Sequence, residues 1–257
     1  MATTTDDIHI RVRNLTMAYG ETVIQRDLNF DVRRGDIFII MGGSGCGKST
    51  LLKHLIGLNE PRSGDILYGD QNLWKLSERK RRALMQHFGI SYQSGALISS
   101  MTLAENVAMP LELYTALKAP DIRELVSLKL ALVGLAGFEE YYPSEISGGM
   151  KKRAALARAI ALDPDILFFD EPSAGLDPIS AKLLDDLILS LRDSLGATVV
   201  MVTHELASIF AIGSNGVFLD ADSKTLLATG APHDLLNHCE LPTVQRFLRR
   251  GDWEERA

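Results

Sequence analysis

The stretch that most limits what this chain can fold into is a glycine-rich run at residues 42–50, GGSGCGKST. Four of its residues fit the spacing G-x-x-x-x-G-K-[ST]: Gly42, Gly47, Lys48 and Ser49. Glycines let the backbone turn its amide groups onto phosphate oxygens, the lysine reaches the outer phosphates, and the serine hydroxyl ligates Mg²⁺. We therefore predict that the whole run binds phosphate, through Gly42, Gly43, Ser44, Gly45, Cys46, Gly47, Lys48, Ser49 and Thr50.

The residues on either side supply the setting that such a loop needs. Ile37 to Met41 is an apolar run that follows turn residues, which predicts a buried strand. Lys48 to Ile56 has a helical pattern that stops at Gly57, and a helix starting there adds its positive end to the loop amides. The alternative, an ordinary glycine turn, does not require this order of strand, loop and helix. We therefore favour a phosphate-binding P-loop.

Composition narrows the class of protein further. The chain has 257 residues, 46% of them apolar, which suits one large α/β domain or a domain with a subdomain. The formal net charge is −6, so no general basic field is available to hold a nucleic acid. Two cysteines provide no disulfide framework and fit a reducing cytosol. Because no apolar run approaches the ~20 residues of a spanning helix, a membrane function would need another chain to cross the bilayer.

The order of secondary-structure signals predicts separate sheet and helical parts. An antiparallel sheet is expected from three short segments: Ile8 to Val12, Leu28 to Val32 and Ile66 to Tyr68. A helical subdomain is expected in the middle of the chain, from a capping box at Thr102 to Glu105 and helical patterns at Ile122 to Val133 and Met150 to Leu162. Strand–helix alternation then resumes, with strands at Ile166 to Asp170 and Val199 to Val202 and a helix opened by Asp177 and Pro178.

Two acids follow the apolar run ILFF at residues 166–169. A buried strand that ends in a carboxylate can place Asp170 near Mg²⁺, and the next carboxylate, Glu171, can polarise an attacking water. Adjacent acids after a strand are more often part of a solvated loop. The P-loop upstream reverses that preference, and we predict that Asp170 holds the metal and Glu171 is catalytic.

A second glycine-containing helix start lies at residues 147–149. Ser147, Gly148 and Gly149 open an alanine-rich helix whose N-terminus is suited to an anion. One chain has no evident need for two such sites. We therefore predict that two copies meet head to tail, each offering these residues to the nucleotide held by the other.

These pieces, in this order, resemble the ATP-binding cassette (ABC) ATPases over essentially the whole chain. The resemblance implies one nucleotide-binding domain over residues 1–257, with an α/β fold. Its P-loop NTPase (RecA-like) core and antiparallel β subdomain would take residues 1–93 and 163–257, and its helical subdomain residues 94–162. The cofactors implied are ATP and Mg²⁺.

The same resemblance implies roles for further residues. Tyr19 is similar to the aromatic residue that stacks on adenine, and Gln93 to the Q-loop glutamine, which is catalytic and ligates the metal with Ser49 and Asp170. Ser173 to Asp177 resembles the D-loop, and His204 the catalytic switch histidine that acts beside Glu171. Met150 departs from the commonest signature, which has glutamine there; methionine cannot supply an amide, so nucleotide contact rests on Ser147 and the glycine amides.

Two features had competing interpretations. The basic run Glu78 to Arg82 suggests a polyanion site, but a solvated helix face is the favoured reading. An apolar stripe could receive a partner helix or form subdomain core, and its position after Gln93 favours a coupling groove: Leu97, Met101, Leu103, Val107, Met109 and Leu113.

Several phrases, including YQSGALIS, AENVAMPL and SGGM, resemble the ATPases of the Mla/MCE-type phospholipid transporters of diderm bacteria. That resemblance implies a peripheral protein on the cytoplasmic side of the inner membrane, powering phospholipid transport between the inner and outer membranes. The implied partners are a second copy of the chain, an integral-membrane permease, an MCE-domain substrate-binding protein and a STAS-domain subunit, with no nucleic acid. The alternatives are an ABC importer or exporter of amino acids or lipoproteins, and a soluble ABC ATPase that is not coupled to transport.

Overall fold

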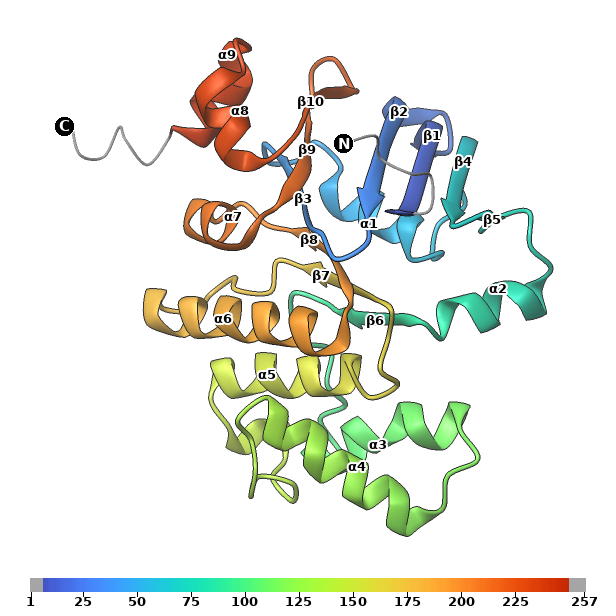
Figure 1. Ribbon diagram of the computed structural model, residues 1–257, viewed down its shortest axis with the longest axis vertical. Helices are drawn as coiled ribbons and strands as arrows, with labels where there is room; N and C mark the ends of the chain where they lie inside the picture. Colours follow the sequence, from blue (N-terminus) through green and yellow to red (C-terminus); the bar gives the residue numbers. More distant parts are fainter. Residues whose placement is uncertain (1–6, 250–257) are drawn as a thin grey trace. The chain divides into compact units, whose positions relative to one another are not determined.

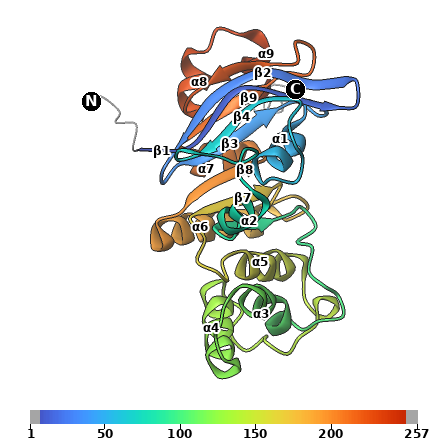
Figure 2. The ribbon, with the colours of Figure 1, turned by 90° about the vertical axis from the view of Figure 1, so that its right-hand side faces the viewer.

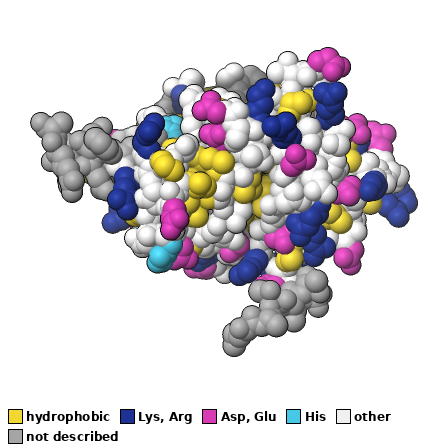
Figure 3. All heavy atoms as spheres, turned by 90° about the horizontal axis from the view of Figure 1, so that it is seen from above, with side chains coloured by type: hydrophobic (Ala, Val, Ile, Leu, Met, Phe, Trp, Pro, Cys, Tyr) yellow, Lys and Arg dark blue, Asp and Glu magenta, His cyan; other side chains and the backbone are white. Residues whose placement is uncertain are grey.

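The computed structural model describes residues 7–249, and these fall into two compact units (Figure 1). The first unit joins the segment up to Met85 to the segment from Thr198 onward, and the second unit is Gln86–Ala197. Within the described residues, no helix is both long enough and apolar enough to cross a membrane. On the face seen in Figure 3, basic and acidic side chains are mixed with small apolar patches.

The first unit contains the antiparallel sheet expected from the sequence. Its strand order is β2-β1-β4-β5 (Figure 1), and its strands are β1 (Ile8–Tyr19), β2 (Thr22–Arg33), β4 (Ser63–Tyr68) and β5 (Gln71–Asn72). The hairpin of β1 and β2 is far longer than predicted, with 12 residues in each strand. Register shifts interrupt the pairing of β1 with β2, and this breaks the two-residue periodicity on which the prediction relied.

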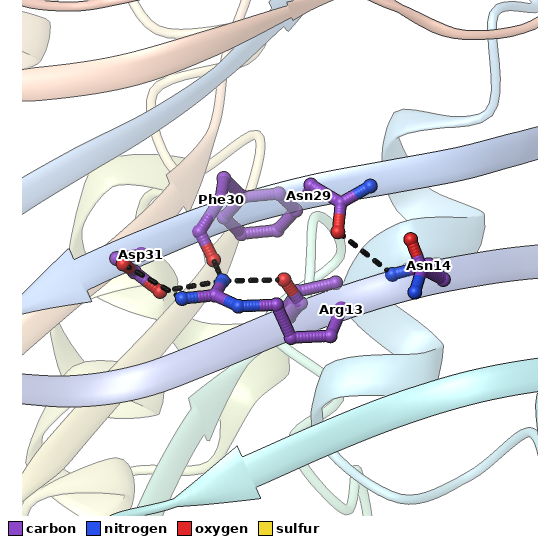
Figure 4. Close-up of polar contacts among 6 residues, drawn as sticks. Arg13, Asn14, Asn29, Phe30 and Asp31 are labelled. Atoms are coloured by element: carbon purple, nitrogen blue, oxygen red, sulfur yellow. Dashed lines mark hydrogen bonds and ion pairs between the residues drawn. The ribbon is translucent and has the colours of Figure 1, made fainter.

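Polar contacts hold the hairpin together beside one of these irregularities (Figure 4). Asn14 has a φ of 48°, and its backbone N–H donates to Asn29 Oδ1 at 2.9 Å. The preceding residue, Arg13, donates to the Phe30 carbonyl at 3.2 Å and forms an ion pair with Asp31 at 2.7 Å. Side chains thus supply bonds between the two strands where the ladder is irregular.

The same unit contains a mainly parallel set of strands. The order is β10-β9-β3-β8, with β3 (Ile37–Gly42) parallel to β8 (Thr198–Val202) and β9 (Asn215–Leu219), and β10 (Leu226–Thr229) antiparallel to β9. Every residue of β3 and β8 is buried, as the continuous apolar runs predict. The helices of this unit are α1 (Lys48–Leu55), α2 (Glu78–Met85), α7 (Leu206–Ile212), α8 (Pro232–His238) and α9 (Pro242–Leu248).

One helix of the first unit answers a question left open by the sequence. The basic run lies in α2, which has no buried residue, so the prediction of a solvated face is confirmed. At the other end of the chain, α9 packs on its own unit through Val244 and Leu248, and Gln245 donates to the Leu235 carbonyl at 3.0 Å. The rest of the C-terminal tail, residues 250–257, lies outside the described residues.

The second unit combines a strand pair with four α-helices. β6 (Phe88–Ser91) and β7 (Ile166–Asp170) are parallel, and a 3₁₀ turn covers Pro143–Glu145. The helices are α3 (Leu103–Tyr114), α4 (Ala119–Leu132), α5 (Gly148–Ala159) and α6 (Pro178–Leu195). α3, α4 and α5 pack against one another (Figures 1 and 2). The segment expected to form the helical subdomain, residues 94–162, lies entirely in this unit.

The start of α3 follows the sequence signal closely. The Thr102 hydroxyl accepts from the Glu105 backbone N–H at 3.2 Å, and the Glu105 carboxylate accepts from the Thr102 N–H at 2.7 Å. This is the predicted capping box. The apolar stripe nearby divides, because Leu103 and Val107 are fully buried while Leu113 is 67% exposed. The stripe is therefore partly subdomain core and partly accessible surface.

Asn106 organises the segment that leads into α3. It is fully buried, its Nδ2 donates to the carbonyls of Ile98, Met101 and Thr102, and its Oδ1 accepts from the Ile98 N–H at 2.8 Å. We expect Asn106→Asp to reduce the free energy of unfolding by about 2–4 kcal/mol, since the carboxylate buries a charge and cannot donate. Urea denaturation followed by circular dichroism measures this.

The exposed Ser100 provides a matched control for the added charge. Ser100→Asp should change the free energy of unfolding by no more than about 0.5 kcal/mol. The loss in Asn106→Asp should shrink at acid pH, where the protonated carboxyl can donate one hydrogen bond. Equal stability of the two variants would show that the Asn106 bonds do not matter.

Candidate active site

The glycine run forms the connection between β3 and α1 in the first unit. Its Gly42, Gly45 and Gly47 have φ values of 144°, 76° and 96°, a region that side-chain-bearing residues rarely adopt. Gly47 is the N-cap of α1, where no side chain accepts a hydrogen bond, and the first turn contains no acidic residue. The positive end of α1 is thus left to an external anion, as expected for a phosphate loop.

Lys48 folds over the loop that precedes it. Its ammonium donates to the carbonyl oxygens of Gly42 at 3.0 Å and Gly43 at 2.8 Å. The positive charge is therefore held above the loop, where it can interact with the outer phosphates of a nucleotide.

Close packing explains why two of the loop positions need glycine. A Cβ at Gly42 would lie 2.4 Å from the Leu219 carbonyl oxygen and 2.6 Å from Cys46 Sγ. A Cβ at Gly47 would lie 2.7 Å from Ile24 Cγ2. The loop is therefore packed against the end of β9 at one point and against β2 at the other.

Gln25 supports the loop from behind, and sequence reasoning missed it. This fully buried side chain donates from Nε2 to the Cys46 carbonyl and to the Asp220 carbonyl, each at 2.7 Å. A lone glutamine within a strand carries no motif, so the sequence offers no signal for this role. Cys46 itself is buried, and burial is the main reason that its pKa is raised, with Lys48 opposing the shift. Its thiol is therefore protonated at neutral pH and serves as packing rather than as a nucleophile.

Two further predicted residues lie in the first unit. Tyr19 is the last residue of β1, is 52% exposed, and its hydroxyl accepts from Asn59 Nδ2 at 3.1 Å. His204 follows β8, and its Nε2 lies 3.5 Å from Glu205 Oε1. Because β8 runs parallel to β3, His204 leaves the sheet at the same edge as the P-loop.

The acids and the Q-loop glutamine lie together in the second unit. β6 and β7 are parallel and Ser91 pairs with Phe169, so Gln93 and Asp170 leave these strands at one edge. Tyr92 immediately precedes Gln93, and its pKa is raised mainly by burial and then by the Asp170 carboxylate. The structure thus brings Gln93 and Asp170 to the same region, because the carboxyl ends of parallel strands meet at one edge of a sheet.

Glu171 has an unusual backbone conformation. Its φ is 50°, in the left-handed region that a non-glycine residue enters at a cost of roughly 1–2 kcal/mol. The strand ends at Asp170, so this strained residue is the first one beyond the sheet. Strain of this kind is typical of residues whose side chain must point in a direction that relaxed backbone does not allow.

The second glycine-containing helix start also has the predicted form. Ser147 is the N-cap of α5, and its hydroxyl accepts from the Met150 N–H at 3.2 Å. A Cβ at Gly148 would meet no heavy atom within 4 Å, so its backbone faces open space. A cavity of about 570 Å³ opens beside it, lined by residues 147–149, by the D-loop residues Gly175–Asp177, and by leucines of α6. Residues 147–149, called the signature segment below, and the D-loop thus border one space within the second unit.

The predicted metal ligands are chemically suited to magnesium. Ser49, Gln93 and Asp170 all offer oxygen atoms, the donors that Mg²⁺ prefers, and Mg²⁺ in nucleotide sites takes few protein ligands. In the described part of the chain, no cluster of three or more His, Cys, Asp or Glu side chains could hold a metal.

Comparison with known proteins identifies the family. Residues 25–174 match the family model of the ABC transporter. The chain belongs to the ABC transporter family. It is one of the ATPases of this family, so the predicted P-loop ABC ATPase with a mixed α/β fold is confirmed. The roles of its individual site residues stay predictions.

Specific relatives of this ABC ATPase include transport proteins from several bacteria. The intermembrane phospholipid transport system ATP-binding protein MlaF of Haemophilus influenzae is 43% identical, over 93% of this chain and 90% of that protein. The probable ribonucleotide transport ATP-binding protein mkl of Mycobacterium leprae is 40% identical, over 94% of this chain and 69% of that protein. Among solved structures, the dimeric ATP-binding cassette MJ0796 in a post-hydrolysis state with ADP and Pi is 27% identical, covers 86% of this chain and 98% of its own, and has a TM-score of 0.78.

The packing of the P-loop glycines predicts that alanine substitution reduces the free energy of unfolding at one position and not at its neighbour. Gly42→Ala should lower the free energy of unfolding by about 1–3 kcal/mol, because its new Cβ would overlap the Leu219 carbonyl. Gly43→Ala is the matched control, since its Cβ would meet no heavy atom within 4 Å and its φ lies outside the left-handed range. Chemical denaturation of both variants measures the difference. Similar losses in the two would contradict the packing argument.

Proposed function

We propose that this ABC ATPase powers the transport of phospholipid between the inner and outer membranes of a diderm bacterium. The observation that supports this most strongly is the 43% identity to MlaF, which extends over 93% of the chain. The SGGM sequence at residues 147–150 supports the same branch of the family, because methionine there is a match and not a defect.

The proposed chemistry assigns each predicted site residue a step in ATP hydrolysis. Lys48 and the amides of residues 42–50 bind the phosphates, and Tyr19 stacks on the adenine. Ser49, Gln93 and Asp170 hold Mg²⁺, which neutralises phosphate charge when bound. Glu171 orients and polarises the attacking water, and His204 bridges towards the γ-phosphate.

A second copy of the chain is the proposed partner for the signature segment. The backbone at Gly148 and Gly149 is available for an anion. The Ser147 hydroxyl oxygen accepts a hydrogen bond from the Met150 N–H, which leaves the hydroxyl hydrogen free to donate to that anion. We infer that these groups bind the nucleotide of the partner copy. The dimeric state of the MJ0796 cassette supports this arrangement.

The other proposed partners are membrane and periplasmic components. An integral-membrane permease would receive the force of ATP-driven closure through the surface between Gln93 and Leu113. An MCE-domain protein would carry the lipid, and a STAS-domain subunit would bind the ATPase. The chain itself would sit at the cytoplasmic face of the inner membrane.

A second candidate cargo comes from the relatives named mkl. These are described as probable ribonucleotide transport proteins and are 39–40% identical to this chain. Their chains extend well beyond the matched part, since this chain covers only 66–69% of them. We therefore favour phospholipid, for which the relatives match along 88–90% of their own length.

The cargo can be tested with the assembled transporter. We expect the complex purified with its permease to contain phospholipid by mass spectrometry, and to move labelled phospholipid between vesicles only when ATP is present. The Glu171→Gln complex is the control for ATP-driven movement. A complex that carries no lipid and responds instead to ribonucleotides would support the second candidate.

The catalytic assignments predict two different kinds of inactive protein. Lys48→Ala should abolish ATP binding, because it removes the charge held over the P-loop by the Gly42 and Gly43 carbonyls. Glu171→Gln should keep ATP affinity and lower kcat by roughly a hundredfold or more, because only the group that orients water is lost. Equilibrium binding of a fluorescent ATP analogue and phosphate release measure the two properties. Near-normal hydrolysis by Glu171→Gln would contradict its assigned role.

A further inference from the structure

The segment that follows Gln93 is bound to α5 by two basic side chains. Arg158 donates from Nη1 to the Ala96 carbonyl at 2.8 Å and from Nη2 to the Gly95 carbonyl at 3.0 Å. Lys152 donates from Nζ to the Gln93 carbonyl. All of these residues belong to the second unit. Three carbonyl groups of the Q-loop backbone, those of residues 93, 95 and 96, are therefore held by one helix.

The backbone of this segment needs such support because it contains a tight turn. The Gly95 N–H donates to the Tyr92 carbonyl at 2.8 Å, and both Gly95 and Ala96 have positive φ values, 75° and 48°. Ala96 carries this conformation without the freedom of glycine. The Gly95 and Ala96 carbonyls accept from the charged guanidinium of Arg158. Charged donors form stronger hydrogen bonds than neutral ones.

The charge of the proposed catalytic acid also influences Lys152. Burial is the main influence on Lys152 and lowers its pKa, whereas the nearby Glu171 carboxylate opposes that shift. The favourable interaction between the two charges means that the lysine lies within electrostatic reach of Glu171. One ammonium group thus contacts the Gln93 backbone and attracts the Glu171 carboxylate.

We propose that Lys152 is a positioning residue for ATP hydrolysis, which fixes the Q-loop backbone at Gln93 from α5. This inference rests on the proposed roles of Gln93 and Glu171. Lys152 lies five residues after Ser147 on the helix that begins with the signature segment. The hydrogen bond therefore connects that helix to the backbone of Gln93, the predicted metal ligand of the Q-loop.

A positioning role for Lys152 differs in its effects from a role that merely stabilises the fold. A structural role would be lost in any variant that unfolds and would affect binding and turnover together. A positioning role requires a long cationic donor, so arginine should replace lysine while methionine, of similar bulk, should not. It should also affect turnover far more than nucleotide affinity, because its hydrogen bond is to the Gln93 backbone, which is not assigned to phosphate binding.

The test compares full-length Lys152→Met, Lys152→Arg and wild-type protein in the assembled transporter. We expect Lys152→Met to lower kcat roughly tenfold or more, with its affinity for a fluorescent ATP analogue within about twofold of the wild type. Lys152→Arg should restore most of the rate. Lys182→Met is the matched control, because Lys182 is an exposed lysine of α6 in the same unit, and it should hydrolyse ATP normally.

The thermal midpoint of each variant is measured alongside, and Lys152→Gln, whose side chain is too short to reach, takes the place of Lys152→Met if that variant does not fold. A wild-type rate in Lys152→Met, in preparations where Glu171→Gln is inactive, would overturn this inference and leave the proposed function intact. Equal losses in Lys152→Met and Lys152→Arg would also overturn it. Activity of Glu171→Gln would overturn the proposed function itself.

Discussion

The phosphate loop depends on how closely Gly42 approaches the backbone of the neighbouring strand. Gly42 is still paired with Leu219 of β9 when the chain turns out of the sheet, and no side chain fits in the space between them. Five residues later Gly47 packs against Ile24 of the antiparallel hairpin. Gln25 completes this support by bonding both to the loop and to the residue after β9. The loop shape is thus set by contacts on its two sides, before any nucleotide binds.

Three helices in this protein begin with N-cap residues of different chemistry. At Asp177 the carboxylate accepts from the N–H groups of Ile179 and Ser180, so the start of α6 is already compensated. A side-chain hydrogen bond with Ser180, and then these N–H groups, lower the pKa of Asp177. At Ser147 a neutral hydroxyl accepts a single bond. At Gly47 no side chain accepts at all. Anion affinity should therefore be greatest at the last, which is where the sequence places its lysine.

Much of this architecture could be predicted from the sequence, because its signals are local. The P-loop spacing, the Thr102 capping box, the Asp177 and Pro178 helix start and the apolar strands each depend on neighbouring residues. The long hairpin was underestimated because bulges break the alternation that marks a strand. Gln25, Asn106 and Lys152 could not be foreseen at all. Their partners are carbonyl groups of a folded backbone, and an amide or ammonium side chain gives no sign in the sequence of which carbonyls it will meet.

The left-handed backbone at Glu171 has a consequence for anyone who redesigns this protein for heat resistance. A procedure that chooses residues to suit backbone dihedral angles would replace this glutamate with glycine or asparagine, which enter that region more easily. The product would be a more robust scaffold that no longer turns over its nucleotide. At this one position, thermal stability and catalytic activity favour different residues. A screen for thermal stability alone would therefore select the inactive protein.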